Sequence, residues 1–131
     1  MQPGLDVGAT AEVAVITTPA MAITFDGPPK LSVFSTPSML WQMEMAAHEV
    51  LKPYLDPGEA SVGVTANVSH SAPTPIGMKV TARARVTAID RRRVSFAIEV
   101  FDEKEKIGEG THDRFVIDVA RFASRVEQKS S

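Results

Sequence analysis

The sequence predicts an α+β fold in which a curled antiparallel sheet wraps round one long central helix. Residues 35–55 repeat apolar side chains with the period of a helix. The other patterned segments alternate apolar and polar residues, which is the period of a half-buried strand. Four of these segments follow the helix and are joined largely by short turns, so neighbouring strands are expected to pair antiparallel.

The predicted helix, STPSMLWQMEMAAHEVLKPYL, is expected to be surrounded on most of its sides. Its apolar residues form a broad face centred on Met43. Trp41 and Met45 lie on the opposite side, where a surface helix normally carries polar residues. We therefore expect other elements to enclose this helix.

The ends of the helix are marked by residues with known preferences. Ser35 or Thr36 is the predicted N-cap, with Pro37 at the first helical position, and Pro53 predicts the end. Glu44 lies at the margin of the apolar face. A carboxylate in such a place needs a partner or a function.

Two segments precede the helix. Residues 12–18, EVAVITT, are rich in β-branched side chains and predict a first strand that ends at Pro19. Residues 21–34 contain Asp26, Gly27 and two prolines, and they predict a loop. Loops of this length often line a functional site.

The first strand after the helix is predicted in residues 61–72. Its alternation places Val62, Val64, Ala66 and Val68 on one face, with His70 in phase with them. His70 is therefore expected to point towards the helix unless a bulge changes the phase.

Three further strands are predicted in residues 78–89, 93–101 and 107–119. In the first two, the expected inward residues are Val80, Ala82, Ala84, Val86, Ala88, Val94, Phe96, Ile98 and Val100. Gly108 and Gly110 interrupt the last strand and predict a bulge or a close backbone contact. Residues after Phe122 are charged or serine-rich and are expected to fray.

Composition limits the possible classes of function. A chain of 131 residues with 44% hydrophobic residues is expected to form a single domain over residues 1–131. The net charge of -2 argues against general nucleic-acid binding. Without cysteine there is no disulfide or thiolate nucleophile, and the three histidines have no metal-ligand spacing, so no metal site is expected. No signal peptide or membrane span is predicted, and a cytoplasmic location is expected.

Three polar residues converge on the predicted helix: Thr36 at its start, Glu44 two turns along it, and His70 on the strand face that should cover it. Eight residues separate Thr36 from Glu44, which is roughly 12 Å along a helix. The two side chains are therefore predicted to line one groove without bonding directly. Each residue also has a purely structural interpretation, as an N-cap, a rim carboxylate and a core histidine respectively.

Several segments of the chain resemble the acyl-CoA thioesterases of the fluoroacetyl-CoA thioesterase type. These segments are VFSTPSM, MEMAAHEVLKPYLDPGEASVG, VSHSAPTPIGMKVTARARV and IGEGTHDR, and the resemblance extends from about Gly4 to Phe122. It implies a hotdog fold, in which the sheet encloses the helix, and a homodimer with its active site at the subunit interface. It also implies an acyl-CoA substrate and no cofactor.

The resemblance implies roles for individual residues. Thr36, Glu44 and His70 match the catalytic threonine, glutamate and histidine of the family. Gly63 matches a glycine whose backbone N–H is a candidate for polarising the thioester carbonyl. Phe34 is expected to contact substrate, although the loop of residues 27–33 lacks the aromatic lid of the fluoroacetyl-specific enzyme.

The turn after residue 89 also departs from the family. Arg91 and Arg92 stand where relatives usually have glycine, and they are predicted to contact the phosphates of coenzyme A. The alternative is a solvated hairpin tip. Phosphate contacts here would make the turn part of the substrate-binding site.

The predicted reaction is hydrolysis of a short or modified acyl-CoA thioester to the free acid and CoA. Thr36 attacks with His70 as base and Glu44 orienting the imidazole, or Glu44 and His70 activate water while Thr36 positions the carbonyl. Two alternatives keep the fold: an enoyl-CoA hydratase or dehydratase, and a non-catalytic acyl-CoA binding protein. Release of CoA from a panel of acyl-CoAs separates the first prediction from both.

Overall fold

The computed structural model describes residues 1–130, so Ser131, the last residue of the expected domain, lies outside the described residues. The strands are β1 (Thr10–Ile16), β2 (Ala22–Phe25), β3 (Leu31–Phe34), β4 (Glu59–His70), β5 (Lys79–Asp90), β6 (Arg93–Phe101) and β7 (Lys106–Asp118). The α-helices are α1 (Thr36–Leu51) and α2 (Val119–Ser130). Short 3-10 turns occupy Pro19–Met21 and Lys52–Tyr54.

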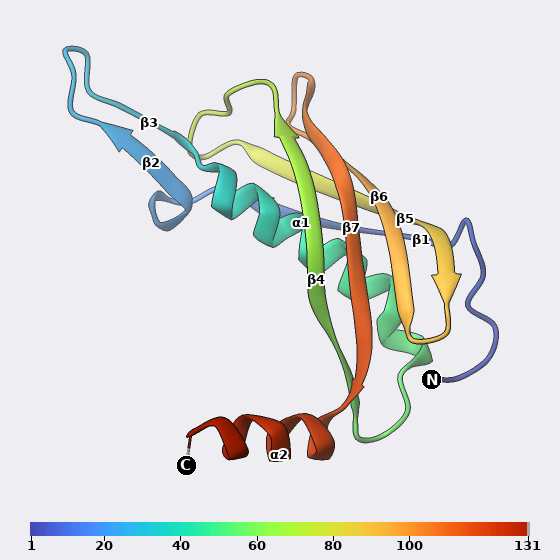
Figure 1. Cartoon of the computed structure of the whole chain (residues 1–131). Helices are drawn as coiled ribbons and strands as arrows, with labels where there is room; N and C mark the ends of the chain where they lie inside the picture. The colour runs from blue at the N-terminus through green and yellow to red at the C-terminus, as the bar shows by residue number, and fades with distance from the viewer. Residues whose placement is uncertain (131) are drawn as a thin grey trace.

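Five strands form one antiparallel sheet in the order β1-β5-β6-β7-β4, and it curls round α1 (Figure 1). β1 and β4 are the edges of this sheet. β2 and β3 form a separate antiparallel hairpin that extends beyond the start of α1 (Figure 1). The predicted α+β architecture, a curled antiparallel sheet round one long helix, is confirmed. The expectation that other elements cover the Trp41 side of the helix is wrong for residues 1–130, because Trp41 is 58% exposed.

The core lies between α1 and the concave face of the sheet. Helix residues Met39, Met43 and Leu51 are fully buried there. The sheet contributes every second residue of β5 and β6, as the alternation predicted: Val80, Ala82, Ala84, Val86, Val94, Phe96, Ile98 and Val100 are buried. Burial of these apolar side chains is the main source of stability, at about 25 cal/mol per Å² removed from water.

Two β-bulges change the phase that the sequence predicts. In β4 the register against β7 shifts between Gly63 and Thr65, and Val64 is 46% exposed. Before this bulge Ser61 and not Val62 is buried, so the prediction that Val62 and Val64 point inward is wrong. In β5 a second bulge follows Val86, which leaves Ala88 exposed. Ile89 packs against the core in its place.

Two other expectations are also wrong. The segment of residues 21–34 forms the hairpin of β2 and β3, closed by the Gly27, Pro28 and Pro29 turn, and is not an irregular loop. The chain after Phe122 does not fray, because Val119–Ser130 forms α2. Three exposed apolar residues at helical spacing lie on α2: Val119, Phe122 and Val126. The strands β2 and β3 have four residues each, which is too short for a clear alternation of apolar and polar residues. The high proportion of charged residues after Phe122 hid the helical pattern of α2.

The glycines of β7 permit close contacts, as predicted. A Cβ atom at Gly108 would lie 2.6 Å from the sulfur of Met39, and one at Gly110 would lie 2.3 Å from the carbonyl oxygen of Asn67. Glycine therefore lets β7 approach both α1 and β4. No helix in residues 1–130 is long and apolar enough to cross a membrane.

Candidate active site

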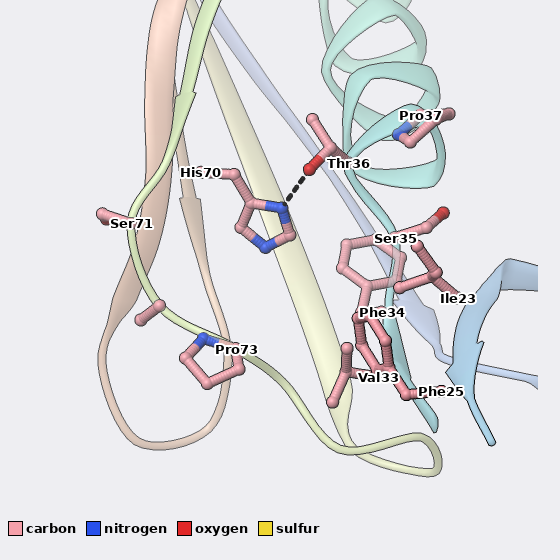
Figure 2. A pocket seen from close by; sticks show the side chains of 11 residues that line it. Ile23, Phe25, Val33, Phe34, Ser35, Thr36, Pro37, His70, Ser71 and Pro73 are labelled. Carbon is pink, nitrogen blue, oxygen red and sulfur yellow. Dashed lines mark hydrogen bonds between the residues drawn. The ribbon is translucent and has the colours of Figure 1, made fainter. Parts of the chain in front are cut away.

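The start of α1 brings a hydroxyl and an imidazole together. Oγ1 of Thr36 lies 2.8 Å from Nδ1 of His70, the last residue of β4 (Figure 2). The capping function falls to Ser35, whose hydroxyl accepts a hydrogen bond from the N–H of Ser38. Thr36 is therefore not needed as the N-cap, and its hydroxyl is left to contact His70.

His70 lies in a partly buried position beside Phe34. The two rings meet edge to face, with centroids 6.4 Å apart and an interplanar angle of 74°. Burial lowers the pKa of His70 below its usual value, and the Ala72 backbone opposes part of that shift. A lowered pKa favours the neutral ring, which can accept a proton at neutral pH.

The second nitrogen of this ring is unusual. Nε2 of His70 is buried and has no hydrogen-bond partner among residues 1–130. When the Thr36 hydroxyl donates to Nδ1, the proton of the neutral ring is on Nε2. A buried N–H without an acceptor is costly, so in this tautomer Nε2 is available to donate to a group from outside residues 1–130.

A mostly apolar cavity of about 470 Å³ adjoins this pair. Figure 2 shows its wall formed by the β2–β3 hairpin, the start of α1 and the chain after β4. Thr36 and His70 supply polar groups, and the apolar lining residues are Ile23, Phe25, Val33, Phe34, Pro37, Ala72 and Pro73. Phe34, a predicted substrate contact, lies in the wall of this cavity beside His70.

Glu44 lies in a different cluster. Its Oε2 atom pairs with Arg114 at 3.3 Å, and its side chain is 30% exposed. It lies against the bulge of β4, where a Cβ atom at Gly63 would come within 2.6 Å of Oε2. Glycine at position 63 therefore leaves room for the carboxylate.

Arg114 organises the groups around Glu44. Its side chain is only 6% exposed, and it donates from Nε and NH2 to the hydroxyl and carbonyl oxygens of Ser61, both at 2.9 Å. Its NH1 faces both Glu44 and Nε2 of His112 at 3.3 Å. Nδ1 of His112 lies 2.8 Å from the carbonyl oxygen of Thr65. Since arginine only donates and a carbonyl only accepts, His112 carries its proton on Nδ1.

The sequence analysis did not identify Arg114 or Ser61 as part of a site. Arg114 lies on β7 and Ser61 lies on the neighbouring strand β4, 53 residues away in the chain. The one available signal was an arginine two residues after His112, on the same face of the predicted strand. His48 is half-buried, and its Nδ1 lies 3.2 Å from the Ser61 hydroxyl.

The predicted site residues therefore fall into three groups. Thr36, His70 and Phe34 line the cavity, and Glu44 and Gly63 line a separate hollow of about 190 Å³. Among residues 1–130 no hydrogen bond joins Glu44 to Thr36 or His70. Arg91 and Arg92 lie on the turn between β5 and β6, at the opposite end of β4 from His70 (Figure 1).

Comparison with known proteins agrees with the predicted fold and family. A curated fluoroacetyl-CoA thioesterase from Streptantibioticus cattleyicolor is 41% identical over 98 residues, which are 75% of this chain and 70% of that protein. The structure of the fluoroacetyl-CoA thioesterase FlK is 33% identical, with a TM-score of 0.88 over 96% of this chain and 98% of that one. One FlK variant was solved in complex with acetyl-CoA.

A thioesterase superfamily member from Thermus thermophilus shares the fold alone, at 24% identity and a TM-score of 0.88 over 98% of this chain and 96% of that one. These matches confirm the hotdog fold. The family described as fluoroacetyl-CoA-specific thioesterase (FlK) matches residues 7–120. The chain therefore belongs to the FlK family of hotdog-fold thioesterases.

Proposed function

We propose that this protein hydrolyses short acyl-CoA thioesters, with Thr36 as nucleophile and His70 as general base. The observation that carries the proposal is the 2.8 Å contact between the Thr36 hydroxyl and Nδ1 of His70 at the wall of an apolar cavity. A hydroxyl beside a neutral imidazole is the arrangement that activates an oxygen nucleophile. Acetyl-CoA bound to an FlK variant supports the substrate class.

The reaction has two halves. His70 takes the proton of Thr36 while Oγ1 attacks the thioester carbonyl. Collapse of the tetrahedral intermediate expels the CoA sulfur, which takes that proton from His70 and leaves as the thiol, and an acyl ester remains on Thr36. Water then attacks that ester, with His70 again accepting a proton, and the free acid leaves as Thr36 recovers its hydrogen. Direct attack of water activated by Glu44 and His70 is the alternative, and it forms no ester on Thr36.

The third catalytic group is Glu44 of a second subunit. Nε2–H of His70 lacks an acceptor, and Oε1 of Glu44 makes no hydrogen bond within residues 1–130. A carboxylate on the far nitrogen of a histidine base holds the tautomer and stabilises the charged ring. Arg114 restrains Oε2 of Glu44, which leaves Oε1 for the imidazole.

A homodimer formed through β4 supplies this geometry. β4, of 12 residues, is an edge strand: it pairs with β7 on one side and with no strand of residues 1–130 on the other. Trp41 of α1 is exposed. Two-fold antiparallel pairing centred between Ala66 and Asn67 places Gly63 opposite the partner subunit's His70. Glu44, which lies against Gly63, then faces that imidazole.

The oxyanion and the acyl group have separate binding groups. The N–H of Gly63 is the proposed donor to the developing oxyanion, across the interface from the attacking hydroxyl. The apolar lining of the cavity, which includes Phe25 and Phe34, fits a small hydrocarbon or halogenated acyl group. Arg91 and Arg92 are predicted phosphate contacts.

The test is release of CoA from a panel of acyl-CoAs, detected with a thiol reagent. Wild-type protein is expected to release CoA from at least the shortest acyl chains, and Thr36→Ala and His70→Ala variants are expected not to. Mass spectrometry of rapidly quenched reactions should find the acyl group on the peptide that contains Thr36. No release above buffer with any acyl chain contradicts the proposal.

A further inference from the structure

An arginine-lined cleft lies between the end of β7 and α2, away from the Thr36–His70 cavity. It has a volume of about 490 Å³, and its charged and aromatic lining residues are Arg92, Phe115, Asp118, Arg121, Phe122 and Arg125. A second hollow, of about 500 Å³, adjoins it and shares Arg92 and Phe115. That hollow is lined by the turn residues Asp90, Arg91, Arg92 and Arg93. The two hollows form one basic surface, which we call the arginine cleft.

The charges of this cleft are only partly neutralised. Arg92 pairs with Glu59 at 3.1 Å, and Arg93 pairs with Asp113 at 2.9 Å. In residues 1–130, no carboxylate pairs with the side chains of Arg91, Arg121 or Arg125. The carboxylate of Asp118 accepts from the backbone N–H of Arg121 and caps the start of α2. A protein with a net charge of -2 thus gathers unpaired guanidinium groups on one surface.

We infer that the arginine cleft binds the phosphates and adenine of the coenzyme A nucleotide. This inference rests on the proposed function, and it adds Arg121, Arg125 and two aromatic residues to the substrate contacts. Guanidinium groups bind phosphate oxygens through paired N–H donors. The arginines come from the turn between β5 and β6 and from α2. Two such groups of donors can bind the separate phosphates of this nucleotide.

The aromatic residues of the cleft suit the adenine. Phe115 is 40% exposed and Phe122 is 42% exposed, although both are large apolar side chains. Exposed aromatic rings of this kind are stacking platforms for nucleotide bases. The combination of unpaired arginines with exposed rings is typical of a nucleotide site.

The position of the cleft fits the length of coenzyme A. Asp118 of the cleft lies opposite Glu59 in the register of β7 against β4. Gly63 is four positions further along β4, so it lies roughly 13 Å from Glu59 at the rise of a strand. The pantetheine arm is about as long as five extended residues, roughly 17 Å. A nucleotide in the cleft can therefore place its thioester at Gly63 and Glu44. His70 of the same subunit, eleven residues from Glu59, is roughly 36 Å away along the strand and out of reach.

The experiment compares two thioesters of the same acyl group. One is acetyl-CoA, and the other is the acetyl thioester of N-acetylcysteamine, which lacks the nucleotide. The test variant is Arg121→Gln with Arg125→Gln. The control is Arg85→Gln with Lys129→Gln, which removes the same charge from an exposed strand position and from α2 outside the cleft.

In the test variant, KM for acetyl-CoA is expected to rise at least tenfold with kcat unchanged, and the truncated thioester is expected to react as with wild type. The control is expected to leave both substrates unaffected. An unchanged KM for acetyl-CoA overturns the inference. An equal loss with both thioesters also overturns it, because the arginines would then act on the fold or the chemistry.

Direct binding separates this inference from the proposed function. Calorimetry with adenosine 3′,5′-bisphosphate should show binding to wild type and control, and loss of binding in the test variant, even in a protein that hydrolyses nothing. The bisphosphate should also inhibit hydrolysis of acetyl-CoA competitively. Binding without such inhibition would indicate a site for a free nucleotide and would contradict a coenzyme A subsite.

Discussion

The Thr36 hydroxyl lies 2.8 Å from Nδ1 of His70, while the other nitrogen of that ring is buried without a partner. The ring is thus held at one nitrogen by a potential nucleophile and needs an acceptor at the other. A serine or threonine hydrolase uses its histidine in this way. The predictions below follow from this relationship and from the Glu44–Arg114 pair.

Removal of either member of the pair should slow the chemical step without unfolding the protein. Thr36→Ala and His70→Ala are expected to lower kcat by about 10²- to 10⁴-fold, since a positioned general base contributes that much. The double variant should be no slower than the slower single variant, because the two residues act as one unit. Steady-state kinetics measure this, and fully additive losses would contradict it.

Gly63→Ala tests the space beside Glu44. The added Cβ would lie 2.6 Å from Oε2, so the carboxylate must move. A displacement of about 1 Å in a catalytic group costs roughly 10²-fold in rate. We expect that loss in kcat with a thermal midpoint near that of wild type. Val64→Ala, at the exposed bulge residue next to it, is the matched control and should retain activity.

Arg114 should stabilise the fold through Glu44. Arg114→Met leaves a partly buried carboxylate without its partner, and breaking such a pair costs about 3 kcal/mol. The double variant with Glu44→Gln should lose less than the sum of the two single variants. Urea denaturation gives the coupling energy. Additive losses would show that the ion pair carries no net interaction.

Acidification should destabilise the protein through His112. Burial lowers the pKa of His112, and its Nε2 accepts from Arg114, so a protonated ring would face a guanidinium. The unfolded state then binds more protons, and the free energy of unfolding falls as pH drops through 6.5 towards the lower folded pKa. Thermal melts between pH 7.5 and 5 should show a smaller acid loss in His112→Asn. Equal losses would contradict this assignment.

The sequence predicted those features that depend on local pattern. Alternation located β6 and most of β5, and helical periodicity with Ser35 and Pro53 located α1. The phase of β4 before Thr65 was wrong because one bulge residue, Val64, moves every earlier side chain to the other face. His70 lies beyond the bulge, and its predicted direction was therefore correct.

The missing parts of the site depend on contacts between distant segments. Arg114 reaches Glu44 only because β7 pairs with β4 beneath the helix, and no local pattern encodes that pairing. The helix rise predicted that Glu44 and Thr36 do not bond directly, but it did not predict that they line two separate hollows. The unsatisfied nitrogen of His70 is the observation from which we propose an acceptor in a second subunit.

The most direct test is complementation between two inactive subunits. Thr36→Ala protein is mixed with Glu44→Ala protein under conditions where native mass spectrometry confirms subunit exchange. If each site combines Thr36 and His70 of one subunit with Glu44 of the other, half of the dimers are mixed and each has one intact site. The mixture should then recover about a quarter of wild-type activity. No recovery after complete exchange would contradict the shared site.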